Sequence, residues 1–172
     1  IDINIIKKQI IGILNTAIET IDAMRAAEAA NLLPSIKSNL EEIIGNIEII
    51  KRELPDTLKN YREKLVKNVD ELNIGFSEDN ERKILMEIAF FTDKIDVSEE
   101  LERLKSHILQ FEKYLCMNNS EPVGKTLEFL LQEMNREINT CSVKSMNSEI
   151  SKAVVNIKNL LDKIKEQIMN LV

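Results

Sequence analysis

The sequence has few of the residues that end helices. Its 172 residues include four glycines, three prolines and no tryptophan. Turns must therefore be scarce and the elements long, with a core of Ile, Leu, Val and Met. No run of eighteen uncharged apolar residues exists, so we predict no membrane-spanning segment. The first residues lack an initiator Met and a signal-peptide region, so we expect a cytoplasmic protein and a cut made inside a longer chain.

Cysteine and histidine are also scarce. Cys116 and Cys141 lack C-x-x-C spacing, which favours reduced, structural thiols over a disulfide or a metal site. His107 is the only histidine, so a two-histidine ribonuclease mechanism is excluded within one chain. The sequence has no glycine-rich phosphate loop, no H-E-x-x-H and no G-x-S-x-G. Any hydrolysis must therefore rely on carboxylates, for which a divalent metal ion is the natural partner.

Basic residues are outnumbered by acidic ones. The chain carries 23 Lys and Arg against 29 Asp and Glu, a net charge of −6. This balance argues against a surface that binds polyanions generally. An RNA partner would need a local basic patch, divalent cations, or a basic segment outside this chain.

What is present is helical periodicity. Apolar residues recur every three or four positions from residue 3 to residue 24, which predicts a first long helix that Pro34 ends or kinks. A second helix is predicted from residue 36 until Pro55 breaks it, and a third from residue 58 to 72. Gly75 suits the C-cap of that third helix. We expect residues 1–75 to form a long helical hairpin or arm region.

Residues 76–172 are predicted to form a C-terminal helical domain. Ser77 is a candidate N-cap for a helix that reaches about Lys94. Asp96 and Glu99 match a capping box before the next helix. The apolar residues of that helix alternate spacings of four and three, as in the a/d seam of a coiled coil. They are Val97, Leu101, Leu104, Ile108, Phe111 and Leu115.

Two more helices complete the predicted domain. One opens at Pro122 and has an apolar face of Val123, Leu127, Leu130, Met134 and Ile138. A short polar joint over residues 139–145 leads into the last helix, which carries an apolar face from Ile150 to Leu171. No alternating β pattern is present. The predicted fold is all-α, with long antiparallel helices packed as a bundle with coiled-coil-like seams.

Polar residues flank the seam of the fifth predicted helix. At about 100° per residue, Glu100 and His107 lie two turns apart on nearly one line, with Arg103 between them and slightly further out. Such a row is typical of a salt-bridge network that fixes helix register. A metal or catalytic site is the alternative.

The following helix concentrates polar groups within two turns. Glu133 and Glu137 are i,i+4 neighbours of like charge beside the apolar face, where the repulsion is less screened. The pair needs a compensating cation, which could be Arg103, Arg136 or a metal ion. Ordinary polarity on an amphipathic helix is the alternative. The same turns contain two weak helix formers, Asn135 and Asn139.

Several segments resemble the signatures of the YicC/YloC-like family of bacterial endoribonucleases. Residues 95–107 are similar to D-[IV]-x-E-E-[LI]-x-R-L-x-[SA]-H, and residues 121–140 to E-x-x-G-[RK]-x-L-[DE]-F-x-x-Q-E-x-N-R-E-x-N-T. Residues 142–145 fit S-x-K-S, and the last helix fits R-E-Q-x-x-N with Lys165 in the arginine place. The likeness upstream is looser, because Ala29 replaces the glycine of an R-x-x-E-G element; residues 61–65 are similar to Y-R-x-[RK]-L.

The resemblance implies a metal-dependent endoribonuclease, directed to single strands, that assembles as a homo-oligomer and uses Mn²⁺ or Mg²⁺. It also implies roles for the polar residues, which we state as hypotheses. Metal ligands or a general base would come from Glu100, His107, Glu133 and Glu137. RNA and its phosphates would be held by Arg25, Arg103, Arg136, Lys144, Gln132, Asn135 and Asn139.

Two other functions fit the same sequence. A helical scaffold or adaptor would use the seams to form an oligomer and would suit the acidic surface. An RNA-binding regulator would deliver RNA to another nuclease without cutting it. An adaptor does not need the like-charge pair of Glu133 and Glu137 beside Arg136, whereas a metal site does.

Overall fold

The computed structural model describes residues 3–71, 78–116 and 123–169, and it confirms the all-α prediction. The elements are α1 (Ile3–Glu71), α2 (Glu78–Ile95), α3 (Ser98–Leu115), α4 (Gly124–Lys144) and α5 (Ser148–Met169). No strand occurs within these ranges. The candidate helix stop at Gly75, the candidate cap Ser77 and the predicted helix start at Pro122 lie outside the described residues.

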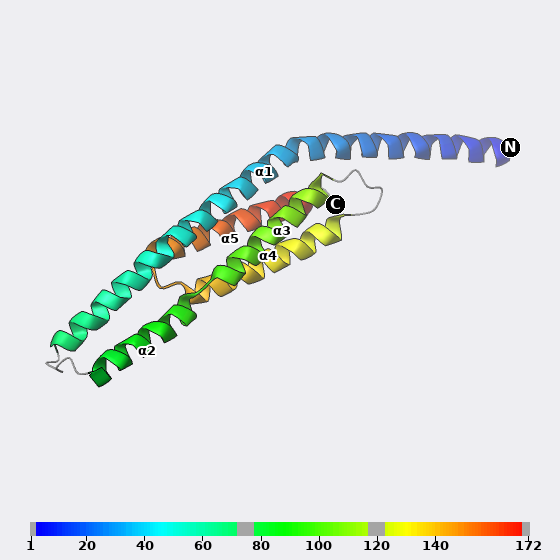
Figure 1. Ribbon diagram of the computed structural model, residues 1–172. Helices are drawn as coiled ribbons and strands as arrows, with labels where there is room; N and C mark the ends of the chain where they lie inside the picture. Colours follow the sequence, from blue (N-terminus) through cyan, green and yellow to red (C-terminus); the bar gives the residue numbers. More distant parts are fainter. Residues whose placement is uncertain (1–2, 72–77, 117–122, 170–172) are drawn as a thin grey trace.

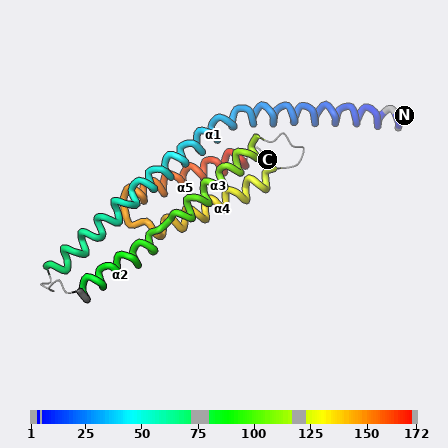
Figure 2. The backbone as a smooth tube through the Cα atoms, viewed as in Figure 1, coloured from blue at the N-terminus to red at the C-terminus, as the bar shows by residue number. Residues whose placement is uncertain are grey.

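Four of the five helices surround one core. Helix α1 packs against α5, α5 against α4, α4 against α3, and α3 against α1. Helix α2 runs in the same direction as α3, which comes after it, and packs beside the C-terminal part of α1 (Figure 1; Figure 2). Consecutive packed helices run antiparallel, as predicted for a bundle.

The core is built from the predicted apolar seams. On α1 the spacing of four and three continues through Ile36, Leu40, Ile43, Ile47 and Ile50, all with 0% exposure. The seams of α3, α4 and α5 join the same cluster of buried residues. Because one cluster includes side chains from α1, α3, α4 and α5, these helices stabilise one another. The predicted domain boundary between residues 75 and 76 stays a prediction.

Helix α1 does not end at either of its two prolines: the predicted break at Pro55 is wrong, and Pro34, which was predicted to end or kink the helix, does not end it. Helix α1 is continuous through Pro34 and Pro55, although it changes direction between its blue N-terminal part and the part that enters the bundle (Figure 1). The carbonyls that lose a donor belong to Ala30 and Lys51, and both residues are exposed, so water can bond them. An interior proline costs about 3 kcal/mol. Burial of the five α1 core residues contributes on the order of 10 kcal/mol, which outweighs that cost.

The capping box predicted between α2 and α3, with Asp96 and Glu99 as its two side chains, does not form. Asp96 accepts a hydrogen bond from the backbone N–H of Ser98, at 2.9 Å, rather than from Glu99. The backbone N–H of Asp96 donates to the carbonyl of Thr92 at 3.0 Å, so it completes α2 and has no need of the Glu99 carboxylate. The two helices follow each other so closely that Asp96 serves both.

Helix α4 is longer than predicted and includes most of the supposed polar joint. It continues to Lys144, and the break before α5 lies at residues 145–147. The reason is Cys141, which continues the apolar face of Met134 and Ile138 at spacings of four and three and has 0% exposure. A hydrogen bond of 2.9 Å from Asn147 to Thr57 joins this break to α1.

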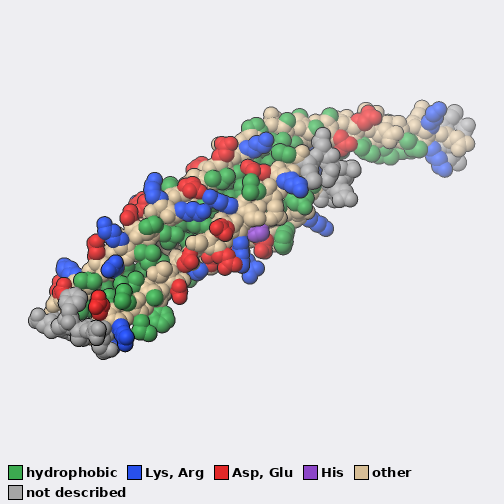
Figure 3. Space-filling view, viewed as in Figure 1, with side chains coloured by type: hydrophobic (Ala, Val, Ile, Leu, Met, Phe, Trp, Pro, Cys, Tyr) green, Lys and Arg blue, Asp and Glu red, His purple; other side chains and the backbone are tan. Residues whose placement is uncertain are grey.

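The first part of α1 extends beyond the bundle. We call residues 3–31 the N-terminal arm; every described side chain between residues 4 and 28 is exposed. Figure 3 shows hydrophobic side chains along its surface. They include Ile6, Ile10, Ile13, Leu14, Ile21 and Met24, each between 41% and 71% exposed. None of the described helices is both long and apolar enough to cross a bilayer.

Candidate active site

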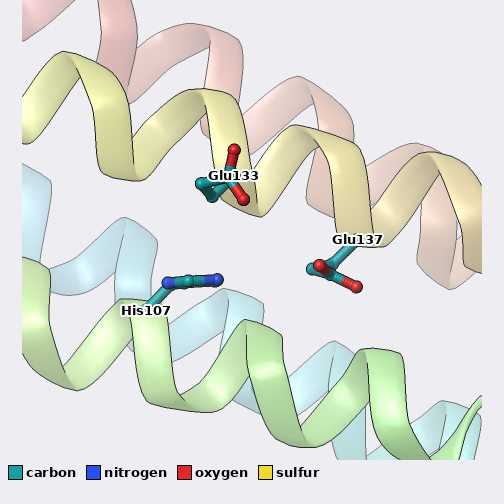
Figure 4. Close-up of side chains that lie close together, drawn as sticks. All are labelled: His107, Glu133 and Glu137. Atoms are coloured by element: carbon teal, nitrogen blue, oxygen red, sulfur yellow. The ribbon is translucent and has the colours of Figure 1, made fainter.

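Helices α3 and α4 bring one histidine and two glutamates together. The imidazole of His107 extends from α3 toward the carboxylates of Glu133 and Glu137 on α4 (Figure 4). One ligand atom from each residue lies within 4.8 Å of the other two. Across the described ranges, no other set of three His, Cys, Asp or Glu residues meets in this way. We call these three residues the α3–α4 acidic group.

The position of this group follows from the packing of the seams. Ile108 and Met134 are buried in the core, at 1% and 0% exposure. His107 and Glu133 each precede one of these core residues by one position, which is about 100° around a helix. Their side chains therefore lie at the edge of the interface between α3 and α4. Glu137 follows Met134 by three residues and points further inward, with its side chain only 7% exposed.

Two cations accompany the like-charge pair, as the sequence analysis required. An Arg103 guanidinium nitrogen lies 3.8 Å from Glu137, and an Arg136 nitrogen lies 3.9 Å from Glu133. These distances are those of ion pairs and are too long for hydrogen bonds. Arg103 also pairs with Glu99 on its own helix. The carboxylates are partly compensated, and their oxygens keep lone pairs for another ligand.

The donor set fits a divalent metal ion. Two carboxylates and one imidazole are ligands that Mn²⁺ accepts, and Mg²⁺ is bound by one or two carboxylates together with waters and phosphates. The Nδ1 atom of His107 is buried and makes no hydrogen bond to any described residue. A buried nitrogen without a partner costs about 1–3 kcal/mol, and a ligand would remove that cost. The group is therefore not a closed salt-bridge network, because one of its buried nitrogens has no partner among the described residues.

Glu100 is not part of this group. Its carboxylate accepts a hydrogen bond of 2.8 Å from Lys144, which also donates to the backbone carbonyl of Asp96 at 2.7 Å. The bond to Glu100 raises the pKa of Lys144 above its ordinary value. Glu100 and His107 are seven residues apart, about 10 Å along the helix axis. Glu100 and Lys144 thus form an internal pair, apart from the ligand atoms that meet at His107.

A buried thiol lies near this internal pair. Burial of Cys141, and secondarily the negative charge of Glu100, raise the pKa of its thiol to about 12. The structure contains no disulfide between Cys116 and Cys141, and both are free thiols, as the sequence predicted. Cys141 is therefore a packing residue that is held in its protonated form.

The other predicted RNA-contacting residues divide between two places. Arg25 is exposed on the N-terminal arm and does not join the acidic group. The amides of Gln132, Asn135 and Asn139 line a groove on the flank of α4 that faces Lys165 of α5. The sequence analysis assigned no role to Lys165. The signal that could have indicated one is its place in the terminal R-E-Q-x-x-N signature, where it replaces the arginine.

Comparison with known proteins assigns the chain to a family. The family model described as "Endoribonuclease YicC-like, C-terminal" matches residues 50–172, a stretch that includes α3, α4, α5 and the whole acidic group. The chain belongs to the YicC-like endoribonuclease family. The family model begins inside α1, so the N-terminal arm precedes the matched stretch.

Curated YicC proteins match the arm as well as the bundle. The chain is 36% identical over 164 residues to the "Probable endoribonuclease YicC" of Clostridioides difficile (strain 630). The aligned region covers 93% of this chain and 55% of that protein. The chain is 29% identical over 170 residues to the "Probable endoribonuclease YicC" of Haemophilus influenzae, covering 99% of this chain and 58% of that protein. The chain thus spans a little more than half the length of these YicC relatives.

Proposed function

We propose that this protein is a metal-dependent endoribonuclease and that the α3–α4 acidic group is its reaction centre. The observation that carries the proposal is the meeting of His107, Glu133 and Glu137, within 4.8 Å, in a chain of the YicC-like endoribonuclease family. The unpartnered Nδ1 atom of His107 supports a bound cation at this place. We propose Mn²⁺ or Mg²⁺ as the ion and RNA as the substrate.

The two carboxylates have different surroundings, which suggests different tasks. The side chain of Glu137 is 7% exposed and lies beside Arg103, so it is the more fixed of the two and holds the ion together with His107. The side chain of Glu133 is 26% exposed. A carboxylate oxygen of Glu133 takes the proton of the attacking group, which is a water or the ribose 2′-hydroxyl. A bound divalent ion lowers the pKa of that group and offsets the charge that develops on the phosphate oxygens.

The arginines position the phosphate. Arg136 is 76% exposed and stands beside Glu133, where its guanidinium can take two phosphate oxygens at once. Arg103 is more tightly engaged, since it pairs with both Glu99 and Glu137. As the proton passes to Glu133, the attacking oxygen bonds to phosphorus, and the bond from phosphorus to the leaving ribose oxygen breaks. The leaving oxygen takes its proton from solvent.

The N-terminal arm suits a homo-oligomer. A helix that leaves its apolar stripe exposed is poorly stable in water, because most helical stability comes from burying such a face. We expect a second copy of the chain to cover the stripe around Ile10 and Leu14, which are 52% and 54% exposed. An Ile10→Asp variant should lower the molar mass measured by light scattering, while Asn15→Asp leaves it unchanged. A parent protein of monomeric mass would contradict the assembly.

The cytoplasm is the proposed place of action, since both described cysteines are free thiols and the proposed substrate is RNA. Cleavage of a labelled single-stranded RNA tests the function. We expect cuts with Mn²⁺, none in EDTA, and a loss of at least a hundredfold in Glu133→Gln, as for a lost general base. Glu102→Gln, an exposed change on the opposite flank of α3, is the control and should cut normally.

The same assay separates the alternatives. Circular dichroism of each variant establishes that the helices are intact. A folded parent that binds RNA in EDTA but never cuts it would favour the RNA-binding regulator. A folded parent that neither binds nor cuts would leave the oligomeric scaffold. A Glu133→Gln variant that cuts as the parent does would remove the acidic group from the reaction.

A further inference from the structure

A groove between α4 and α5 has the composition of a nucleotide-binding surface. Its volume is about 710 Å³, within the range of pockets that hold small ligands. Amides of Gln132, Asn135 and Asn139 line it from α4, and the ammonium of Lys165 lines it from α5. Val143, which is 85% exposed, adds an apolar surface. The groove therefore offers hydrogen-bonding groups, a cation and a surface against which a planar base can pack.

The groove and the acidic group lie on opposite flanks of the same helix. Glu133 and Asn135 are two residues apart, which is about 200° around α4. Glu133 faces α3, whereas Asn135 lines the groove beside α5. Arg136 belongs to both places, since it lines the groove and stands 3.9 Å from Glu133. A ligand that extends over the exposed side of α4 would reach both sites, with Arg136 between them.

The polar groups of the groove are available for a ligand. Among the described residues, the side chains of Lys165, Gln132 and Asn139 have no hydrogen-bond or ion-pair partner, whereas the side chain of Lys144 is engaged with Glu100. Asn135 donates to the carbonyl of Leu131 at 3.2 Å and keeps its side-chain oxygen as an acceptor. Two cations and one carboxylate, that of Glu128, line the groove. Its charge is thus positive, although the chain has a net charge of −6.

We propose that this groove binds a nucleotide of single-stranded RNA next to the one held at the acidic group, with Lys165 as its phosphate anchor. The inference rests on the proposed function for the choice of RNA as ligand. Lys165 and Arg136 contact successive parts of the backbone. The amides contact the ribose 2′-hydroxyl and the base edges, which are open only in a single strand. The groove thereby selects single strands for the reaction centre.

Binding can be measured without cleavage. The probe is a fluorescein-labelled single-stranded oligoribonucleotide, titrated with the protein in EDTA and followed by anisotropy. Lys165→Gln should weaken binding by about tenfold, as expected for one lost charge-assisted contact. The slope of log K against log salt should fall by about 0.7, the value for one phosphate on a single strand. Lys163→Gln is the matched control, since Lys163 is also exposed on α5 but does not line the groove.

Each outcome decides the proposal. Equal affinity of Lys165→Gln and the parent overturns it, and so does an equal loss in both lysine variants, which would indicate general charge attraction. A change of molar mass in Lys165→Gln with unchanged affinity assigns the groove to a second copy of the chain and also overturns it. Cleavage by the parent in Mn²⁺ is measured separately. A parent that binds through Lys165 but does not cut supports the groove and contradicts the proposed nuclease.

Discussion

Lys144 donates a hydrogen bond of 2.8 Å to Glu100 and so joins the last turn of α4 to the first turn of α3. The side chains of Glu100 and Lys144 are only 13% and 30% exposed. The pair lies on the same edge of the α3–α4 interface as His107, but two turns away. We propose that this pair fixes the two helices relative to each other and so positions the acidic group without entering it.

Glu100→Gln should therefore affect stability more than chemistry. The substitution replaces an ion-paired hydrogen bond with one from the Lys144 ammonium to a neutral amide oxygen, so we expect a loss of about 1–2 kcal/mol in the free energy of unfolding, measured in urea. RNA cleavage with Mn²⁺ should stay within about threefold of the parent, a change of less than 1 kcal/mol in the barrier.

The control for this prediction is Glu102→Gln on the same helix. Glu102 is exposed, so its unfolding free energy should stay within about 0.5 kcal/mol of the parent. If folded Glu100→Gln lost cleavage as fully as Glu133→Gln does, Glu100 would belong to the reaction centre after all.

Asp96→Ala should destabilise the junction of α2 and α3 in a pH-dependent way. Asp96 accepts from the Ser98 N–H, and the Ser98 hydrogen bonds lower the pKa of Asp96 below its ordinary 3.8. Because the folded pKa lies below the unfolded one, the contribution to stability is present above about pH 3.8 and is lost as the pH falls through the folded pKa. We expect the variant to lose about 1 kcal/mol at pH 7.

Urea titrations at pH 7 and at successively lower pH would measure this difference. The gap between Asp96→Ala and the parent should narrow as the pH drops below 3.8. The exposed Asp162 gives the control, since Asp162→Ala should match the parent throughout. A gap that is independent of pH would mean that the carboxylate charge does not matter at the junction.

The two cysteines should differ in reactivity toward a thiol reagent. Cys116 is exposed, whereas Cys141 has 0% exposure and a thiol pKa raised to about 12 by its burial. At pH 8 the native protein should release colour from Ellman's reagent for one thiol per chain, and for both of its two cysteines in denaturant. Cys116→Ser should remove the native signal. Fast reaction of both thiols in the native protein would contradict the buried position of Cys141.

Much of the fold follows from the spacing of apolar residues. The seams on α3, α4 and α5 and the α1 residues 36–50 were all identifiable from intervals of three and four, because such intervals place side chains on one face of a helix. The breaks were less predictable. Pro34 and Pro55 carry a strong local signal for a helix end, but the packing of α1 against its neighbours outweighs it. Local residue preferences cannot weigh that tertiary contribution.

The site was predictable in its residue types and less so in its grouping. The like charges of Glu133 and Glu137 pointed to a compensating cation, and the structure places Arg103 and Arg136 beside them. Glu100 lies apart from the acidic group, where its carboxylate is hydrogen-bonded to Lys144. That contact joins residues 44 positions apart in the sequence, and no periodicity within one helix reveals it. The position of Lys165 in the groove likewise depends on how α5 packs against α4, which the sequence of one helix does not reveal.

Titration of the protein with Mn²⁺, in the absence of RNA, would show whether the α3–α4 acidic group holds a metal ion. We expect one ion bound per chain by calorimetry, together with a rise in melting temperature that grows with metal concentration. His107→Ala and Glu137→Gln should both lose this binding while keeping their helical circular dichroism, and Glu100→Gln should keep it. Unchanged Mn²⁺ binding in His107→Ala and Glu137→Gln, or none in the folded parent, would contradict a metal centre at this group.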